Sequence, residues 1–148
     1  MNPNLKMSDR TAILATMDPA SVAASTVVSG WVPVANFHSI AALLQTGVLG
    51  TSATIDAKLR QATDASGTNA KDITGKSITQ IVKASGDNKQ ATIEVRGEEL
   101  DVTNGFAYVA LSVTVGTAAS IFGASIFGVN PRYAPASALN QAAVVQQV

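Results

Sequence analysis

The segment from Thr103 to Val115, TNGFAYVALSVTV, restricts the possible fold more than any other part of the chain. It begins with Asn-Gly and continues as a strand pattern in which neither face carries a charge, because side chains of a strand alternate between two faces. A strand on the surface of a monomer usually turns polar or charged residues outward. We therefore expect this strand to be covered by a second sheet or by a neighbouring subunit.

The Asn104-Gly105 dipeptide predicts a two-residue hairpin, because a type I′ turn needs positive φ at both central positions. This hairpin would pair Glu99–Val102 with the strand that begins at Phe106. Ser85-Gly86-Asp87-Asn88 is a second turn by composition.

Other segments also show strand patterns. Thr54–Gln61 and Ala91–Arg96 alternate apolar with polar residues and predict half-buried antiparallel strands. His38–Thr46 permits a strand or a buried helix, and its Ala-Ala-Leu-Leu core favours the helix by propensity. Further short strands are expected at Thr11–Ala15 (ending before Met17-Asp18-Pro19), at Thr26–Val34 (interrupted at Gly30) and at Ser120–Val129. The spacing from Ile78 allows one helical turn or a short strand, and the strand is favoured.

Many short strands separated by turns predict an all-β fold. We expect one antiparallel β-sandwich, jelly-roll-like, over residues 11–133, with an extended N-terminal arm over residues 1–10 and a C-terminal arm over residues 134–148. The last part of the chain, Ala136–Val148, contains no charged residue. Both arms are predicted to be flexible in the free subunit and ordered in an assembly.

The amino-acid composition favours a protein that assembles with other subunits over one that carries out chemistry in solution. Ten basic residues balance ten acidic ones, and charged residues make up only 14% of the 148-residue chain. The sequence therefore predicts no nucleic-acid or membrane partner, and its low charge indicates a homo-oligomer or a docked subunit. Cysteine is absent, which excludes disulfides and thiolate chemistry.

The motifs that usually carry catalysis are weak. Ala70–Ser77 imitates a phosphate-binding loop but lacks the first glycine. His38 is the single histidine and begins an apolar run, so a structural role is favoured over that of a catalytic base. The acidic residues Glu98, Glu99 and Asp101 suit either a calcium site or a solvated turn paired with Arg96 and Arg60. We therefore predict no enzyme activity, no cofactor, no catalytic residue and no metal site.

Aromatic residues are the candidate interface anchors, since such side chains often dominate the energy of interfaces. The candidates are Trp31, Phe106, Tyr108 and Tyr133. Tyr108 is expected on the uncharged outer face of its strand, and Tyr133 lies between two prolines near the C-terminal arm.

Two long segments resemble small virion proteins encoded in the head-gene region of tailed bacteriophages. The first is WVPVANFHSIAALLQTGVLGTSATIDAKLRQATDASGTNAKDITGKSITQ (Trp31–Gln80), and the second is EVRGEELDVTNGFAYVALSVTVGTAASIFGASIFGVNPRYAPAS (Glu94–Ser137). The recurrent pieces are the tryptophan strand and the ATIDAKL, RGEELDV, LSVTVGTAAS and RYAPAS motifs. None of these pieces carries a catalytic signature.

The resemblance implies a capsid decoration (cement) protein, whose partners are the major capsid protein and copies of itself. It further implies localisation to the capsid surface of the virion after synthesis in the host cytoplasm. Two alternatives stay open at this point, namely a head-tail connector or tail component and a soluble carbohydrate-binding β-sandwich.

Overall fold

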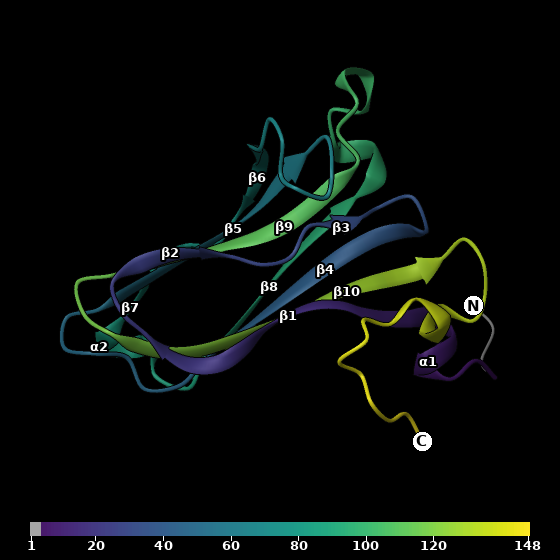
Figure 1. Cartoon of the computed structure of the whole chain (residues 1–148). Coiled ribbons are helices and arrows are strands. Elements are labelled where there is room, and N and C mark those ends of the chain that lie inside the picture. The colour runs from purple at the N-terminus through teal and green to yellow at the C-terminus, as the bar shows by residue number, and fades with distance from the viewer. Residues whose placement is uncertain (1–3) are drawn as a thin grey trace.

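The computed structural model describes residues 4–148 and consists of two antiparallel sheets packed face to face (Figure 1). The first, called the β1 sheet, has the order β1-β10-β4-β8 and comprises β1 (Thr11–Val22), β10 (Ser120–Pro131), β4 (Phe37–Thr46) and β8 (Gln90–Arg96). The second, called the β2 sheet, has the order β2-β9-β5-β6 and comprises β2 (Ser25–Val28), β9 (Tyr108–Gly116), β5 (Thr54–Ala62) and β6 (Lys71–Ser77).

Two short strands complete the β2 sheet, in which β3 (Val32–Pro33) pairs with β9 and β7 (Ile81–Val82) pairs with β5. When β2 with β3 and β6 with β7 each count as one interrupted strand, the chain changes sheet after every strand except between β5 and β6, which is the jelly-roll order. The predicted all-β, jelly-roll-like sandwich is therefore confirmed. Short helical turns lie between strands, namely α2 (Lys83–Gly86), η1 (Gly97–Glu99) and η2 (Val102–Asn104), while α1 (Met7–Arg10) precedes β1 and η3 (Ala136–Leu139) follows β10.

The core lies between the two sheets and follows the strand period of two. In β5, Ile55, Ala57 and Leu59 face inward at 0–3% exposure, as their alternation predicts. In β9, every second residue from Val109 to Val115 is buried against the β1 sheet. The opposing sheet contributes a matching set of buried side chains: Phe37, Ile40, Leu44, Val95 and Ile126.

The helical preference of His38–Thr46 is wrong, because this segment forms β4. It pairs with β10 on one side and β8 on the other, so every residue from Ser39 to Gln45 has neighbours on both flanks. Ile40, Ala42 and Leu44 alternate inward in register with the core. Pairing and burial outweigh the helix propensity of Ala and Leu here.

The predicted break at Met17-Asp18-Pro19 is also wrong. β1 continues to Val22, with a shift of register between Met17 and Ala20 where Pro19 lies. β1 is an edge strand, so the missing amide of proline breaks no ladder there.

The predicted Asn104-Gly105 hairpin does not form. Asn104 ends the short turn η2, and only Gly105 has positive φ, at 81°. The residues before the turn pair with no strand; the Phe106 amide instead donates to the Asp101 carbonyl at 3.2 Å. Strand β8 ends earlier, at Arg96, and belongs to the other sheet. The Asn-Gly pair therefore closes a crossover loop between sheets, and Gly105 supplies the left-handed residue that ends η2.

The terminal segments lie at the same end of the molecule (Figure 1). Residues 1–3 of the predicted N-terminal arm lie outside the described residues. In the C-terminal segment, Ala136 is fully buried, and the amide of Gln141 donates to the carbonyl of Ile13 at 2.8 Å. The Asn140 side-chain oxygen accepts from the Ile13 amide at 2.8 Å. Beyond this clamp on β1, Val145 and Val148 are exposed and the chain projects away from the sandwich (Figure 1).

The contact between β10 and β4 allows a direct test of this core. A Cβ atom placed on Gly128 would lie 2.5 Å from ring atoms of Phe37, which is 1% exposed. Gly128→Ala is therefore expected to lower the free energy of unfolding by about 1–3 kcal/mol, as overpacking does in other cores. Urea unfolding monitored by circular dichroism measures this change.

Gly97→Ala is the matched control, because a Cβ at Gly97 meets nothing within 4 Å. Its unfolding free energy should stay within about 0.5 kcal/mol of the parent. Equal stability of the two variants would contradict the close contact between Gly128 and Phe37.

Candidate functional site

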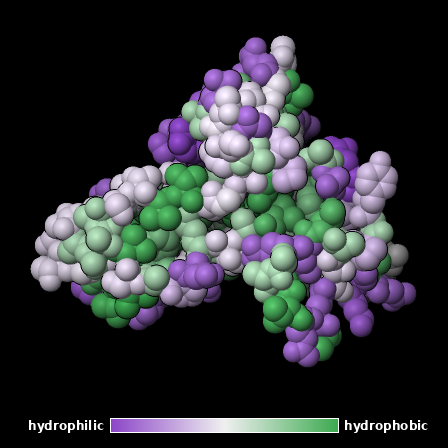
Figure 2. Space-filling view, in the orientation of Figure 1, coloured by the Kyte–Doolittle hydropathy of each residue, from purple (hydrophilic) through white to green (hydrophobic). Residues whose placement is uncertain are grey.

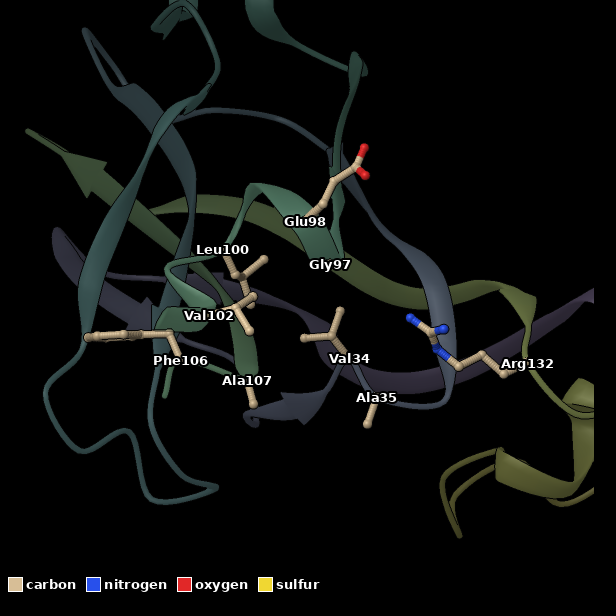
Figure 3. A pocket seen from close by; sticks show the side chains of 9 residues that line it. All are labelled: Val34, Ala35, Gly97, Glu98, Leu100, Val102, Phe106, Ala107 and Arg132. Carbon is tan, nitrogen blue, oxygen red and sulfur yellow. The ribbon is translucent and has the colours of Figure 1, made fainter. Parts of the chain in front are cut away.

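An apolar hollow of about 340 Å³ opens at one end of the sandwich, where loops from both sheets meet (Figure 3). Its floor is formed by Val34, Leu100 and Phe106, which are 5–7% exposed. The exposed residues Ala35, Val102 and Ala107 form its rim. The segments that build it follow β3, β8 and β10, so residues distant in sequence converge here.

Charged groups border the hollow on one side. Arg132 follows β10, and its guanidinium points towards the apolar lining, whereas the Glu98 carboxylate points away (Figure 3). Glu98 is instead paired with Arg96 at 3.3 Å. A second cleft of about 290 Å³ adjoins the hollow, sharing Gly97, Glu98 and Arg132 and adding His38 and Arg96. The side that the two spaces share is therefore basic.

Ion pairs with β6 hold the wall of the hollow. Lys71 pairs with Asp101 at 2.5 Å, and Lys76 pairs with Glu99 at 2.8 Å. The Lys71 ammonium also lies 4.1 Å from the centre of the Phe106 ring, a cation–π contact. The hydrogen bond from Lys71, then that from Asn104, lowers the pKa of Asp101. The hydrogen bond from Lys76, then that from the Arg96 amide, lowers the pKa of Glu99.

These contacts determine what the acidic turn and the lysine-rich segment do. Each of Glu98, Glu99 and Asp101 has its own basic partner, so the turn is ion-paired. The pairing of Glu98 with Arg96 agrees with the solvated-turn hypothesis, whereas Arg60 pairs with Asp72 at 3.1 Å. Within residues 4–148, no three His, Asp or Glu side chains gather as a group fit for a metal ion. A phosphate-binding loop must lead into a helix, whereas Ala70–Ser77 leads into strand β6.

A second candidate is the outer surface of the β1 sheet, where the adjacent strands β1, β10 and β4 carry a single Asp, Glu, Lys or Arg residue, Asp18 of β1. Strand register places the outward residues in rows, with Thr11, Val129 and Ser39 in one and Ile13, Phe127 and Ala41 in the next. Ser125 and Leu43 form a third pair. All eight are half-buried and uncharged; the charges of this sheet lie on its edge strands, with Glu94 and Arg96 on β8 and the exposed Asp18 farther along β1. We call these eight residues the uncharged face.

The outer surface of the β2 sheet is different. Its central strand β9 is uncharged, as predicted, but the adjacent strand β5 directs Asp56, Lys58 and Arg60 outward. Lys58 and Arg60 both pair with Asp72 of β6, at 2.7 and 3.1 Å. The outward Ala110 and Ser112 are 0% and 3% exposed because they lie beside these long side chains. The small residues of β9 are therefore already covered within the subunit.

The four predicted anchors occupy different environments. Phe106 is 7% exposed and lines the hollow, whereas Tyr108 is half-buried on β9 beside Pro33 and Ala62. Trp31 packs on Gly67, where a Cβ would lie 2.4 Å from the indole nitrogen. Tyr133 is 78% exposed. The structure thus brings none of them together as one aromatic patch.

Hydrophobic side chains are visible in several regions of Figure 2. They gather on the left, over β2 and where β10 begins, and again on the C-terminal segment that projects below the sandwich. Ile121 at the start of β10 is 43% exposed and Val28 of β2 is 40% exposed. Part of the C-terminal segment, including Val144, lines a cavity of about 280 Å³ together with Thr11 and Ile13 of the uncharged face.

Sequence reasoning missed Arg132, Val34 and Leu100 as members of one site. The sequence offers one local hint: no strand or helix pattern accounts for the arginine that follows the last strand and precedes Tyr133. It also missed the uncharged face, because Phe127, Ile13 and Leu43 become neighbours only once the sheet order is known.

Comparisons with known proteins assign no function. No family model matches the chain, and no curated protein matches it. In the described part of the chain, no helix has the length and apolar character needed to cross a membrane.

Solved structures with a similar general fold include viral capsid proteins and a carbohydrate-binding module. A Triatoma virus structure has a TM-score of 0.46 at 8% identity, covering 95% of this chain and 74% of that chain. The cowpea mosaic virus top component has a TM-score of 0.43 at 11% identity, covering 86% and 90%. TmCBM61 in complex with β-1,4-galactotriose has a TM-score of 0.38 at 12% identity, covering 77% and 70%. Similarity at this level assigns no function.

The ion pairs in the wall predict a pH dependence. A carboxyl whose folded pKa is lowered stabilises the fold while it is ionised, and this contribution is lost as the pH falls through that pKa. Asp101 and Glu99 should therefore hold the wall fully above about pH 4.3 and release it progressively as the pH falls below that value through their lowered pKa values. NMR resonances of the Leu100 and Phe106 side chains should broaden or shift in that window.

Asp101→Asn is the control, because it removes one of the two titrating groups. In this variant the Phe106 resonances should already differ at pH 7 and change less on acidification. If the parent resonances are constant from pH 6 to below pH 3 while the protein stays folded, the ion pairs do not hold the wall.

Proposed function

We propose that this protein is a structural component of a virus particle, a decoration protein that binds the outer shell of a tailed-phage head as a homo-oligomer. The observation that supports the proposal best is the uncharged face across β1, β10 and β4. The resemblance of Trp31–Gln80 and Glu94–Ser137 to small virion proteins points the same way. The major capsid protein and further copies of this chain are the proposed partners.

The uncharged face suits a broad contact. A standard protein interface covers about 800 Å² on each partner, and the chain has 8028 Å² of accessible surface in total. An interface of that size is therefore about one tenth of the surface, an extent suited to one face of a small sheet. Ile13, Phe127 and Leu43 supply apolar area there, and burying them requires no charge to be desolvated.

A decoration protein needs only a modest contact per copy, because repetition over a shell adds avidity. The C-terminal segment adds to that contact in this proposal. It leaves the sandwich at the edge of β1, next to Ile13, and carries exposed valines at positions 145 and 148. Segments of this kind gain order when they pack on a partner.

The uncharged face is tested by placing a charge in it. Leu43→Lys lies in the central strand β4, where an added ammonium would be buried without a partner on binding. Cosedimentation with purified capsids that lack this protein should show at least a tenfold loss of affinity, since burying an unpaired charge is costly. Circular dichroism should show an unchanged fold.

Thr74→Lys is the matched control, because Thr74 is exposed on β6 of the other sheet. It should bind capsids like the parent. If Leu43→Lys binds normally while Tyr108→Ala or Tyr133→Ala loses binding, those aromatic anchors carry the interface instead. Absence of cosedimentation, or location of the protein only at the neck or tail of particles, would overturn the decoration proposal.

The terminal segment is tested by proteolysis. Elastase, which cuts after small apolar residues, should trim the free protein within residues 142–148, because most of these residues are exposed. The cut should spare the sandwich, where Ala136 is buried and Gln141 is bound to Ile13. In capsid-bound protein the same residues should be protected. Equal cleavage in the two states, read by mass spectrometry, would show that the segment takes no part in assembly.

A further inference from the structure

We propose that the hollow at the end of the sandwich binds a small organic acid, that is, a carboxylate carried on an apolar body. This site is independent of the uncharged face, since none of the residues that line the hollow belongs to that face. The inference therefore does not depend on the decoration role.

The apolar part of such a ligand has a preformed place. Val34, Leu100 and Phe106 form a floor that is almost completely buried, and the volume of about 340 Å³ lies within the range of small-molecule sites. Because Lys71 and Lys76 tie the facing wall to β6, the space does not depend on a ligand to be open. Preorganisation of this kind lowers the cost of binding.

The carboxylate is assigned to Arg132. Its guanidinium points towards the hollow (Figure 3), and no ion pair or side-chain hydrogen bond of Arg132 occurs in the structure of residues 4–148. A guanidinium presents a planar fork of donors that matches a carboxylate in bidentate geometry. The neighbouring acid, Glu98, is held by Arg96 at 3.3 Å and so does not occupy this fork.

The charge around the hollow favours a monoanion. Arg96 and Arg132 together carry two positive charges and Glu98 carries one negative charge, which leaves a net charge of plus one beside the opening. A neutral sugar would instead require an exposed aromatic face for stacking. Phe106, the aromatic residue of the lining, is 7% exposed and its ring is in contact with Lys71.

The test is an NMR titration of the full chain with hexanoate, using hexanamide as the uncharged match. Hexanoate should shift amide resonances of residues 34–35, 97–107 and 132, and should bind about tenfold or more tightly than hexanamide, because a hydrogen bond to a charged group is the stronger one. Arg132→Gln should remove this preference, and Arg132→Lys should keep part of it. Lys89→Gln, an exposed position at the opposite end of β8, should bind like the parent.

A second variant blocks the hollow without changing its charge. Gly97 lines both spaces, and a Cβ there meets nothing within 4 Å, so the side chain in Gly97→Leu grows into open space. Thermal unfolding should match the parent, whereas hexanoate binding should fall at least tenfold. Loss of binding in this folded variant places the ligand in the hollow.

The carboxylate could come from a partner polypeptide or from a free organic acid. A peptide with blocked termini and a glutamate between two leucines distinguishes these two sources. Tighter binding of the peptide than of hexanoate assigns the site to an acidic segment of a partner polypeptide, and weaker binding assigns it to a free organic acid. The proposal is overturned if hexanoate produces no shifts at millimolar concentration, if the shifts lie elsewhere, or if hexanamide binds as tightly as hexanoate.

Discussion

The structure depends on the central placement of two consecutive strands without charges. No Asp, Glu, Lys, Arg or His occurs from Phe106 to Val129, and this stretch forms β9 and β10. Each strand is flanked on both sides, β9 by β2 and β5 and β10 by β1 and β4. Charged side chains resist burial without partners, so strands that lack them are the ones that can occupy the middle of a sheet at least cost. Joined by a short connection and placed in opposite sheets, β9 and β10 also bring the two sheets together.

Of the charged strands, β6 and β8 lie at sheet edges, whereas β5 lies inside the β2 sheet, and this arrangement makes the outer surfaces unequal. In the β2 sheet, β5 lies next to β9, and its Lys58 and Arg60 extend over the outer surface towards Asp72. In the β1 sheet, the neighbour of β10 is β4, whose outward residues Ser39, Ala41 and Leu43 are uncharged. The uncharged face is therefore found on the β1 sheet and has no counterpart across the middle of the β2 sheet. The difference follows from the order of the strands and not from composition, which is balanced over the whole chain.

Strands whose apolar–polar alternation is visible in their own residues could be predicted from the sequence. Elements whose conformation is decided by pairing with distant strands could not. The alternation of β5 and β8 is visible in their own residues, so both strands and the sandwich class could be predicted. β4 was misread because Ala41–Leu44 favours a helix until the pairing with β10 and β8 is known. Asn104-Gly105 was misread because an Asn-Gly turn also fits the end of a helical turn, where Gly105 alone needs positive φ. The hollow could not be predicted, since Val34, Leu100 and Arg132 come from three separate loops.

The two candidate sites differ in how the fold produces them. The uncharged face is formed by regular strands, so its shape is set by ladder hydrogen bonds and changes little with loop sequence. The hollow is formed by connections at one end of the sandwich and depends on side-chain contacts, namely the Lys71–Asp101 and Lys76–Glu99 pairs and the cation–π contact on Phe106. Loops that rest on a rigid scaffold commonly carry recognition of small groups, whereas broad flat faces suit protein contacts. In this molecule the two kinds of surface lie on different parts of one sandwich, so a change in the hollow leaves the broad face intact.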